Sequence, residues 1–275
     1  MTPTEVQAYL HLLDRTTAPG PTLETLAGLQ ERHMQRVAFE NFSVYLGVAP
    51  VLSVEALFRK VVHERRGGYC FELNTLYGAL LEALGFTVKP VLARVLLRDP
   101  VETPPRTHLV NLVELDGAWY VSDVGFGGLA SRVPLRLDDA GEVDDGDGTV
   151  RLLPQDFDEY LVQRNTPDGW QDQYRFETRR AVPADIKLGN YYTHSHPDSH
   201  FLHHRFIGLF TDTGRMGLFG NRFTERRGIE VVAERTVPDG PEWIAFVRER
   251  FGLPLELPGE ELARLMVAKA GSGNT

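Results

Sequence analysis

The spacing of the apolar residues changes near Lys89, and this change constrains the fold more than any other feature of the sequence. Before it, apolar residues recur at helical intervals, most clearly after the pair Gly67-Gly68. That helical stripe is formed by Leu73, Leu76, Tyr77, Leu80, Leu81 and Leu84. After Lys89, runs rich in Val, Leu and aromatic residues are typical of strands. Helices followed by strands, without regular alternation, predict an α+β chain rather than a doubly wound sheet.

Capping residues predict where the helices of the first 90 residues begin and end. Thr4 can cap a helix over residues 6–13, and Thr22 directly precedes a second apolar stripe. A third helix is expected over residues 54–63. Gly85 is placed to end the helix that follows the double glycine, and the Phe that comes next can fold back onto its last turn.

Strands are expected from residue 90 onward, and helices return near the end of the chain. The expected strands cover residues 90–97, 107–115, 118–124, 152–163, 174–178, 206–211, 216–219 and 229–233. Helices are expected over residues 241–251 and 260–268, and residues 271–275 are expected to form a frayed tail.

The composition narrows the classes of function. The chain has 275 residues, 42% of them hydrophobic, which is enough for a packed globular core. Its formal net charge of −9 argues against general nucleic-acid binding, which needs clustered basic residues. No apolar run approaches the ~20 residues that span a bilayer, and the N-terminal residues have no signal segment. We therefore expect a cytoplasmic protein that binds neither nucleic acid nor membrane.

The single cysteine, Cys70, excludes an internal disulfide and a zinc cage built from cysteines. It falls in the first turn of the helix after the double glycine, where unpaired N–H groups and the helix dipole favour a thiolate. Arg65 and Arg66 lie just upstream and can add to this effect. Most single cysteines are small buried apolar residues, so position alone leaves both a reactive thiol and inert packing open.

The register of one predicted hairpin indicates a base for this thiol. Asp116-Gly117 separates two apolar runs and is a strong signal for a two-residue turn. Counting outwards from that turn places Asp123 opposite Val110 and makes it the diagonal neighbour of His108 on one face of the sheet. Diagonal neighbours are close enough for an imidazole–carboxylate hydrogen bond. Such a pair can simply satisfy a buried histidine, or it can join Cys70 as base and orienting group for a nucleophile.

Three further features invite a ligand interpretation. Gly125, Gly127 and Gly128 follow the candidate carboxylate and could bring backbone N–H groups to an anion or a pyrophosphate, although they form no nucleotide-binding fingerprint. The acidic stretch 138–148 lacks the ligand spacing and the final Glu of a calcium loop. The five histidines between residues 194 and 204 include no pair joined by a catalytic Glu, so we expect no metal site there.

Together these residues resemble the arylamine N-acetyltransferase family. The segments that carry the resemblance are Arg66-Gly67-Gly68-Tyr69-Cys70-Phe71-Glu72-Leu73-Asn74, Thr107-His108-Leu109, Asp123-Val124-Gly125-Phe126-Gly127, Phe39-Glu40-Asn41, Asn190-Tyr191-Tyr192 and Pro197-Asp198-Ser199. The resemblance covers residues 5–205 and is weak beyond them.

The resemblance implies a multi-domain α+β fold. A helical bundle over residues 1–88 would carry the nucleophile, and an antiparallel β-barrel over residues 89–190 would carry the His and the Asp. A linker helix and an α/β lid would follow over residues 191–275. The implied catalytic core is the Cys-His-Asp triad that papain-like and transglutaminase-like enzymes share.

The resemblance also implies a function. By a ping-pong mechanism, acetyl-coenzyme A would acetylate Cys70, and the thioester would then pass the acetyl group to an arylamine, a hydrazine or an N-hydroxyarylamine. Val95, Phe126 and Phe39 would contact the aryl group, and the glycine loop of residues 125–128 would lie near coenzyme A. No metal is implied, and the protein is expected to be a monomer or a homodimer.

Two points stay open at the level of sequence. Family members usually have an Arg two residues after an early Tyr-Leu, whereas here Tyr9-Leu10 is followed by His11-Leu12, which puts an early ion pair with Glu40 in question. The same triad also fits an amide synthase that joins an amine to a polyketide thioester without coenzyme A. A cysteine hydrolase and a non-catalytic domain are likewise compatible with these residues.

Overall fold

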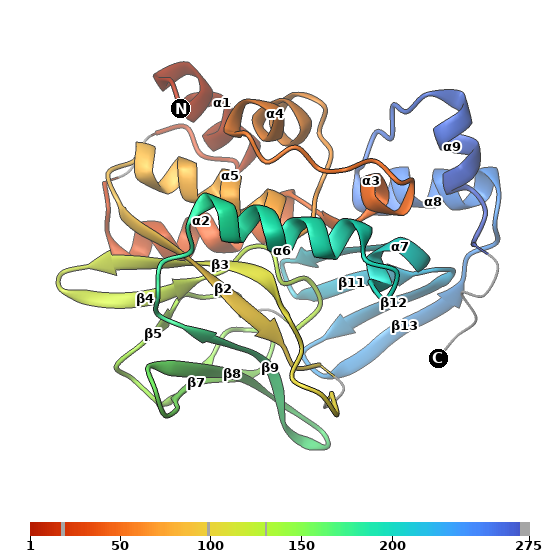
Figure 1. Cartoon of the computed structure of the whole chain (residues 1–275). Coiled ribbons are helices and arrows are strands. Elements are labelled where there is room, and N and C mark those ends of the chain that lie inside the picture. The colour runs from red at the N-terminus through yellow and green to blue at the C-terminus, as the bar shows by residue number, and fades with distance from the viewer. Residues whose placement is uncertain (18–19, 98–99, 130, 270–275) are drawn as a thin grey trace.

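The computed structural model describes residues 1–17, 20–97, 100–129 and 131–269, and it has the predicted α+β fold. The N-terminal helices cover one side of a curled antiparallel sheet, and a second antiparallel sheet with its own helices lies beside them (Figure 1). The helices are α1 (Pro3–Leu12), α2 (Leu23–Arg36), α3 (Phe42–Tyr45), α4 (Val54–Phe58), the π-helix η1 (Arg59–His63), α5 (Cys70–Ala83), α6 (Pro183–Ser195), α7 (His200–His203), α8 (Pro241–Phe251) and α9 (Gly259–Leu265). The strands are β1 (Phe39–Glu40), β2 (Thr87–Val95), β3 (Arg106–Leu115), β4 (Ala118–Ser122), β5 (Leu135–Arg136), β6 (Glu142–Asp144), β7 (Thr149–Pro154), β8 (Glu159–Thr166), β9 (Gly169–Glu177), β10 (Phe206–Thr211), β11 (Gly214–Phe219), β12 (Arg222–Arg227) and β13 (Glu230–Thr236).

The first two helices begin at capping residues, although one cap differs from the prediction. The cap of α1 is Thr2, whose Oγ1 accepts a hydrogen bond from the N–H of Glu5 at 3.2 Å, and the predicted cap, Thr4, lies inside the helix. Pro3 explains the difference, because its fixed φ suits the first helical position and its missing N–H is not needed there. Thr22 caps α2 as predicted.

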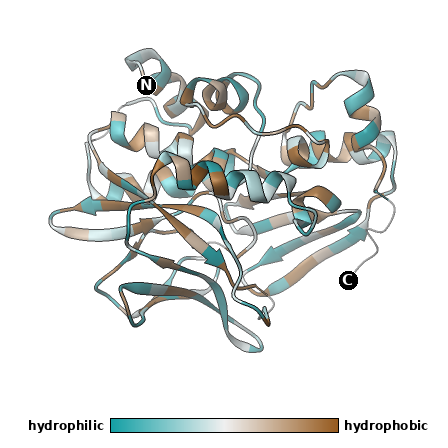
Figure 2. Cartoon of the chain, viewed as in Figure 1, coloured by the Kyte–Doolittle hydropathy of each residue, from teal (hydrophilic) through white to brown (hydrophobic). Residues whose placement is uncertain are grey.

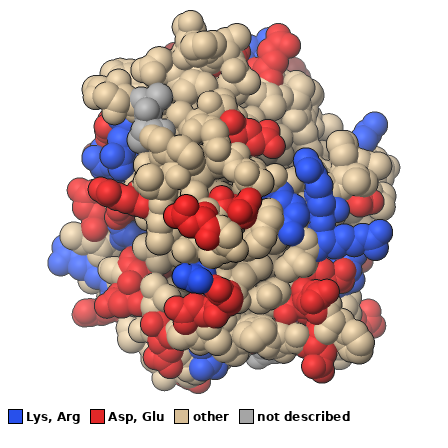
Figure 3. Space-filling model, turned by 90° about the vertical axis from the view of Figure 1, so that its left-hand side faces the viewer, with Lys and Arg blue, Asp and Glu red and all other residues tan. Residues whose placement is uncertain are grey.

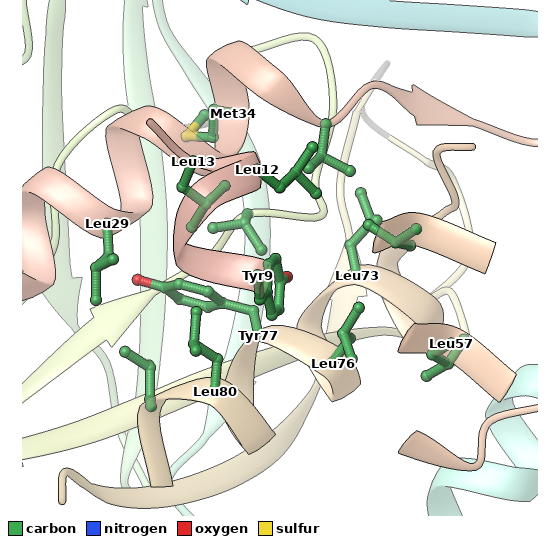
Figure 4. Packing of buried hydrophobic residues seen from close by; sticks show 14 of the residues in the cluster. Tyr9, Leu12, Leu13, Leu29, Met34, Leu57, Leu73, Leu76, Tyr77 and Leu80 are labelled. Carbon is green, nitrogen blue, oxygen red and sulfur yellow. The ribbon is translucent and has the colours of Figure 1, made fainter. Parts of the chain in front are cut away.

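The helix that follows the double glycine, α5, is the central helix of the N-terminal core. It ends as predicted: Gly85 has a φ of +90°, and the N–H of Phe86 donates to the carbonyl of Leu81 at 3.0 Å. Apart from the half-buried Leu84, its apolar stripe is buried and packs with residues of α1, α2 and α4 (Figure 4). The helix predicted over residues 54–63 is present, but its second half is wound as the π-helix η1.

The central sheet has eight antiparallel strands in the order β5-β4-β3-β2-β9-β8-β7-β6, and it curls until β5 approaches β7. The hairpin β3–β4 has the predicted register, with Asn111 opposite Ser122. The single strand predicted over residues 152–163 is wrong, because the chain turns between β7 and β8. Phe157 and Asp158 take positive φ values in that turn. The turn could not be predicted from the sequence, because it contains no Gly at these positions.

The second sheet has the strand order β1-β10-β11-β12-β13 and packs with α3, α8 and α9 around the fully buried Trp243. Its first strand, β1, comes from the N-terminal part of the chain, and Phe39 pairs with Gly208 of β10. Strand β12 was not predicted, because three of its six residues are arginines. The division into domains at residues 88 and 190 stays a prediction; these positions fall within β2 and α6. The expected frayed tail, residues 271–275, lies outside the described residues.

Apolar and polar residues both occur along most helices and strands (Figure 2). Strand β3 is buried on both faces, since residues 108–113 are all buried. On the face drawn in Figure 3, acidic side chains form several patches with basic side chains between them. No helix in the described part of the chain is long and apolar enough to cross a membrane.

Candidate active site

Cys70 is the first residue of α5 and lies where that helix meets the central sheet. Its Sγ is 3.5 Å from the carbonyl oxygen of Thr107, at the start of β3, which is hydrogen-bonding distance for sulfur. The backbone of Gly125 approaches closely, since a Cβ built there would lie 2.8 Å from the Cα of Cys70. The residue is only 3% exposed and belongs to the apolar cluster of the N-terminal helices, but its Sγ has a polar partner in the carbonyl of Thr107.

His108 and Asp123 lie at the positions that the hairpin register predicted. Nε2 of His108 is 2.7 Å from Oδ2 of Asp123, and both side chains are buried. This hydrogen bond leaves Nδ1 of the imidazole for a second partner. The Cys70 side chain interacts electrostatically with the same imidazole. The structure therefore brings a thiol, an imidazole and a carboxylate together from three separate stretches of the chain.

The pKa values of His108 and Asp123 indicate that the two groups form an ion pair. Burial lowers the pKa of His108, but the charge of Asp123, the hydrogen bond that His108 donates to Asp123 and the interaction with the Cys70 side chain raise it to about 10. Burial raises the pKa of Asp123, but the charge of His108 and hydrogen bonds from His108, Asn74 and Gly125 hold it below its ordinary value. At neutral pH the pair is therefore an imidazolium and a carboxylate.

Asn74, one turn after Cys70 on α5, has a role that the sequence did not reveal. Its Nδ2 donates to Oδ1 of Asp123 at 2.8 Å and to the carbonyl of Leu109 at 2.7 Å. Its Oδ1 accepts from the N–H of Val124 at 3.1 Å. The fully buried amide therefore ties the helix to the carboxylate and to β3. The available signal was a polar amide in the buried part of an apolar helix, four residues after the candidate nucleophile.

Two aromatic rings pack against His108. Their centroids lie 5.1 Å away for Phe126 and 5.0 Å away for Tyr174, and the two rings are 4.9 Å from each other. Val95 lies directly opposite Tyr174 in the pairing of β2 with β9, so Val95 and Phe126 both border this ring. Burial and the charge of Asp123 raise the pKa of Tyr174, whose hydroxyl stays protonated and can donate to that carboxylate. Tyr174 was not predicted, because its place depends on the pairing of strands far apart in the sequence.

Phe39, the third residue expected to contact an aryl group, lies on β1 and not beside His108. Its ring stacks on Phe206 at 5.5 Å and packs against Phe201 at 6.4 Å. It also covers the glycine loop, since a Cβ built on Gly127 would lie 3.1 Å from the ring. These aromatic rings therefore form a continuous surface, here called the aromatic wall, from the glycine loop to Phe206 of the C-terminal sheet.

The three glycines of the predicted coenzyme A loop differ in their surroundings. The N–H of Gly125 donates to Oδ1 of Asp123 at 2.8 Å, so this glycine helps to hold the carboxylate. Gly127 has a φ of +76° and packs against Phe39, whereas a Cβ built on Gly128 would have no heavy atom within 4 Å. Close approach therefore requires glycine at the first two positions and not at the third.

Glu40 has a cationic partner even though the early Arg is missing from this sequence. Its Oε1 accepts from Nη2 of Arg66 at 2.8 Å and from Nε at 3.1 Å, and both side chains are buried. Its Oε2 accepts from the N–H of Phe42 at 2.6 Å. The neighbouring Asn41 donates to the carbonyl of His204 at 2.7 Å and accepts from the N–H of Phe206, so this segment also connects to the C-terminal sheet.

The other stretches considered as ligand sites have structural partners. In the acidic stretch, Asp145 pairs with Arg164 of β8 at 2.5 Å, and Asp147 pairs with Arg215 of β11. Asp147 therefore connects the central sheet to the second sheet, whereas Asp145 pairs within the central sheet. Within the described residues, no three His, Cys, Asp or Glu side chains are grouped so that they could hold a metal ion, and this includes the histidines of residues 194–204.

A thiol at a helix N-terminus, beside an imidazolium that a carboxylate holds in place, is suited to nucleophilic acyl transfer. The imidazolium is the form that His108 takes after accepting the thiol proton, so it favours the thiolate, and the carboxylate keeps the ring in the orientation that permits this. The N–H groups of the first turn of a helix lack carbonyl partners one turn earlier, so in α5 they could donate to the oxyanion of a tetrahedral intermediate formed at Cys70.

Comparison with known proteins agrees with this geometry. A family model described as N-acetyltransferase matches residues 22–259. The chain is 35% identical to the arylamine N-acetyltransferase of Escherichia coli over 266 residues, 94% of each chain. It matches the structure of the arylamine N-acetyltransferase from Salmonella typhimurium with a TM-score of 0.91 at 33% identity, over 97% of this chain and 98% of that one. It also matches Mycobacterium marinum arylamine N-acetyltransferase in complex with CoA, with a TM-score of 0.89 at 32% identity, over 95% of this chain and 98% of that one.

Proposed function

The chain belongs to the arylamine N-acetyltransferase family, and from this premise we propose that Cys70, His108 and Asp123 carry out acetyl transfer from acetyl-coenzyme A. The acceptor is an arylamine, a hydrazine or an N-hydroxyarylamine. The observation that supports this proposal most strongly is the 2.7 Å contact between His108 and Asp123 beside the only thiol of the chain.

In the first half-reaction, Cys70 takes the acetyl group. The thiol proton already resides on the His108 imidazolium, and the Cys70 thiolate attacks the carbonyl carbon of the acetyl thioester. The N–H groups of the first turn of α5 stabilise the oxyanion that forms. The bond between the carbonyl carbon and the sulfur of coenzyme A then breaks, and coenzyme A leaves as a thiol with the proton from His108.

In the second half-reaction, the amine replaces coenzyme A. Its nitrogen attacks the carbonyl carbon of the Cys70 thioester, and His108 accepts the proton that the nitrogen loses. The carbon–sulfur bond breaks, and Cys70 leaves as a thiolate beside the imidazolium. An aromatic amine is weakly basic and therefore largely unprotonated at neutral pH, so its lone pair is available without a separate activation step.

The surroundings of the thiol support a planar, apolar acceptor. Phe126 and Val95 both border Tyr174, and Phe39 extends the aromatic wall, so an aryl group can pack against ring faces and edges. The glycine loop is the proposed neighbour of coenzyme A. Because the N–H of Gly125 is engaged by Asp123, Gly127 and Gly128 are the positions whose backbone we propose to face the cosubstrate.

The direct test is acetylation of the wild-type chain and of the Cys70→Ala variant. Wild type is expected to gain one acetyl group in mass from acetyl-coenzyme A and to lose it when an arylamine is added. The variant is expected to show neither step. Amine-dependent transfer by the variant at the wild-type rate would overturn the proposal.

The same assay distinguishes this function from an amide synthase and from a hydrolase. An amide synthase would not consume acetyl-coenzyme A with an arylamine but would join the amine to a polyketide thioester. A hydrolase would release acetate from the acyl-enzyme at a rate that added amine does not change.

A further inference from the structure

Two buried carboxylates and two cations lie around the first turn of the helix that carries Cys70. Arg66 contacts Glu40 at 2.8 Å, and Lys60 contacts Oε1 of Glu72 at 2.7 Å. Glu40 and Glu72 are 0% and 3% exposed, and the Lys60 side chain is 15% exposed. The pairs are also coupled: burial raises the pKa of Glu40, but the charges of Arg66 and Lys60 together lower it below the ordinary value. The four charges therefore form one neutral group, which we call the charge square.

Local geometry places both members of the Lys60–Glu72 pair. Glu72 is the third residue of α5, and its Oε2 accepts from the N–H of Tyr69 at 3.2 Å, so it caps the start of the helix. Gly68 makes room for this, since a Cβ there would lie 2.9 Å from Oε2 of Glu72. Lys60 lies on the π-helix η1, and its carbonyl accepts from the N–H of Arg66 at 3.0 Å. The π-helical turn therefore fixes Lys60 against the loop that leads to the nucleophile.

The capping carboxylate creates an electrostatic conflict. A negative charge in the first turn stabilises the helix, because the N-terminal end of the helix dipole is positive. The same charge opposes a second negative charge at the same helix end, and the thiolate of Cys70 is such a charge. Within a buried site this repulsion is only weakly screened. A cation held against Glu72 removes the conflict while the cap is kept.

We propose that Lys60 is a positioning residue whose charge offsets Glu72 and so keeps the N-terminus of α5 available to the Cys70 thiolate. The inference rests on the proposed role of Cys70 as nucleophile. Lys60 acts through Glu72 and has no part in the transfer of protons or of the acetyl group.

The other titratable groups near the thiol are not part of the charge square. On the sheet side these are His108 and Asp123, which already form an ion pair. The hydroxyls of Tyr69 and Tyr174 are also near, and burial raises the pKa of both, so they are neutral at the pH values of the test. Substitution of Lys60 therefore changes the net charge of the charge square and leaves the other charges near the thiol as they are.

The test measures the rate of iodoacetamide alkylation between pH 4 and pH 9. The chain has one cysteine, so the rate reports on Cys70 alone. Lys60→Met is expected to shift the midpoint of the pH profile upward by about one unit, because Glu72 then carries an unpaired negative charge at the same helix end as the thiolate. Lys60→Arg is expected to restore the wild-type midpoint. The double variant Lys60→Met/Glu72→Gln is expected to return close to it, since the repelling charge is also gone.

Arg59→Met is the matched control. Arg59 is the neighbouring residue on η1, but its side chain is 69% exposed and its contact with Glu64 is 4.0 Å long. Loss of this screened charge is expected to leave the midpoint unchanged. Thermal unfolding of each variant identifies any that is unfolded at the temperature of the assay.

A Lys60→Met profile that coincides with wild type would overturn the inference, and so would an equal shift in Arg59→Met. Loss of thermal stability without a change of midpoint would show that Lys60 has a purely structural role. These outcomes are distinct from failure of the proposed function, which would appear as acetyl transfer that persists after complete alkylation of Cys70.

Discussion

Replacing Asp123 by Asn tests the electrostatic basis of the site, because it removes one charge and keeps the shape. The difference between the ordinary pKa of 6.5 and the value of about 10 for His108 corresponds to roughly 5 kcal/mol in favour of the imidazolium. In Asp123→Asn the burial of His108 is no longer opposed by a carboxylate, so the pKa of His108 is expected to fall below 6.5. The Asn amide can also donate to Nε2, which would put the imidazole proton on Nδ1, where the thiol proton has to go.

We expect kcat/KM for acetyl transfer to an arylamine to fall by at least ~1000-fold in Asp123→Asn. The rate of iodoacetamide alkylation at pH 6 should fall as well, because the imidazolium that stabilises the thiolate is lost. Asp116→Asn is the matched control. It makes the same chemical change in the same hairpin, but at the exposed turn, where Asp116 has a φ of +51° that Asn tolerates. This control should keep wild-type kinetics.

Stability provides a second measurement for Asp123→Asn. The pKa of folded His108 lies above its unfolded value, so the stabilisation by the imidazolium is complete below pH 6.5 and is lost as the pH rises toward 10. The difference in free energy of unfolding between wild type and variant should therefore be larger at pH 6 than at pH 10. Near wild-type turnover in Asp123→Asn, or a difference in stability that does not change with pH, would refute the electrostatic reasoning.

Three further predictions concern Asn74, the buried His33 of α2 and the glycine loop. Asn74→Leu removes three buried hydrogen bonds, so its free energy of unfolding in urea should be lower than that of wild type by roughly 2–5 kcal/mol. Its kcat should fall as well, and a variant with wild-type kcat and wild-type stability would contradict the role of the amide. Burial lowers the pKa of His33 to about 3, below the value of 6.5 expected in the unfolded chain. Wild type should therefore lose roughly 1.4 kcal/mol of stability per pH unit as the pH falls below 6.5. Urea unfolding at about pH 6.5 and about pH 5 should show a smaller loss for His33→Gln than for wild type. Gly125→Ala should impair transfer far more than Gly128→Ala, because only the first Cβ would meet Cys70 and Asn74; equal kinetics for both would show that close approach is unimportant.

The parts of the site that sequence predicts correctly depend on local signals with few physical solutions. Asp116-Gly117 takes positive φ values of 51° and 79°, which few residue pairs tolerate in a two-residue turn. That turn determines the register of β3 with β4, and the register places His108 beside Asp123. The helix of Cys70 is predicted in the same way, from an apolar stripe that ends at a glycine.

The parts that sequence misses depend on tertiary contacts. Tyr174 reaches His108 only because β9 pairs with β2, and the two strands are far apart along the chain. Asn74 reads as a polar interruption of an apolar helix until its three partners are known. The π-helical turn that carries Lys60 has no marker in the sequence. Strand β12 is rich in arginine, so its pairing with β11 is not visible from hydrophobic alternation.

The two-residue strand β1 affects how the protein is completed during synthesis. Phe39 forms a bridge to Gly68, just before Cys70, and pairs with Gly208 in the last third of the chain. At about 5–20 residues per second, a ribosome needs roughly 10–30 s to make the segment between these partners. During that interval the nucleophile's helix has been translated, but β10 and Phe206 have not. The pairing of β1 with β10 can therefore form only seconds after Cys70 and its helix have been made.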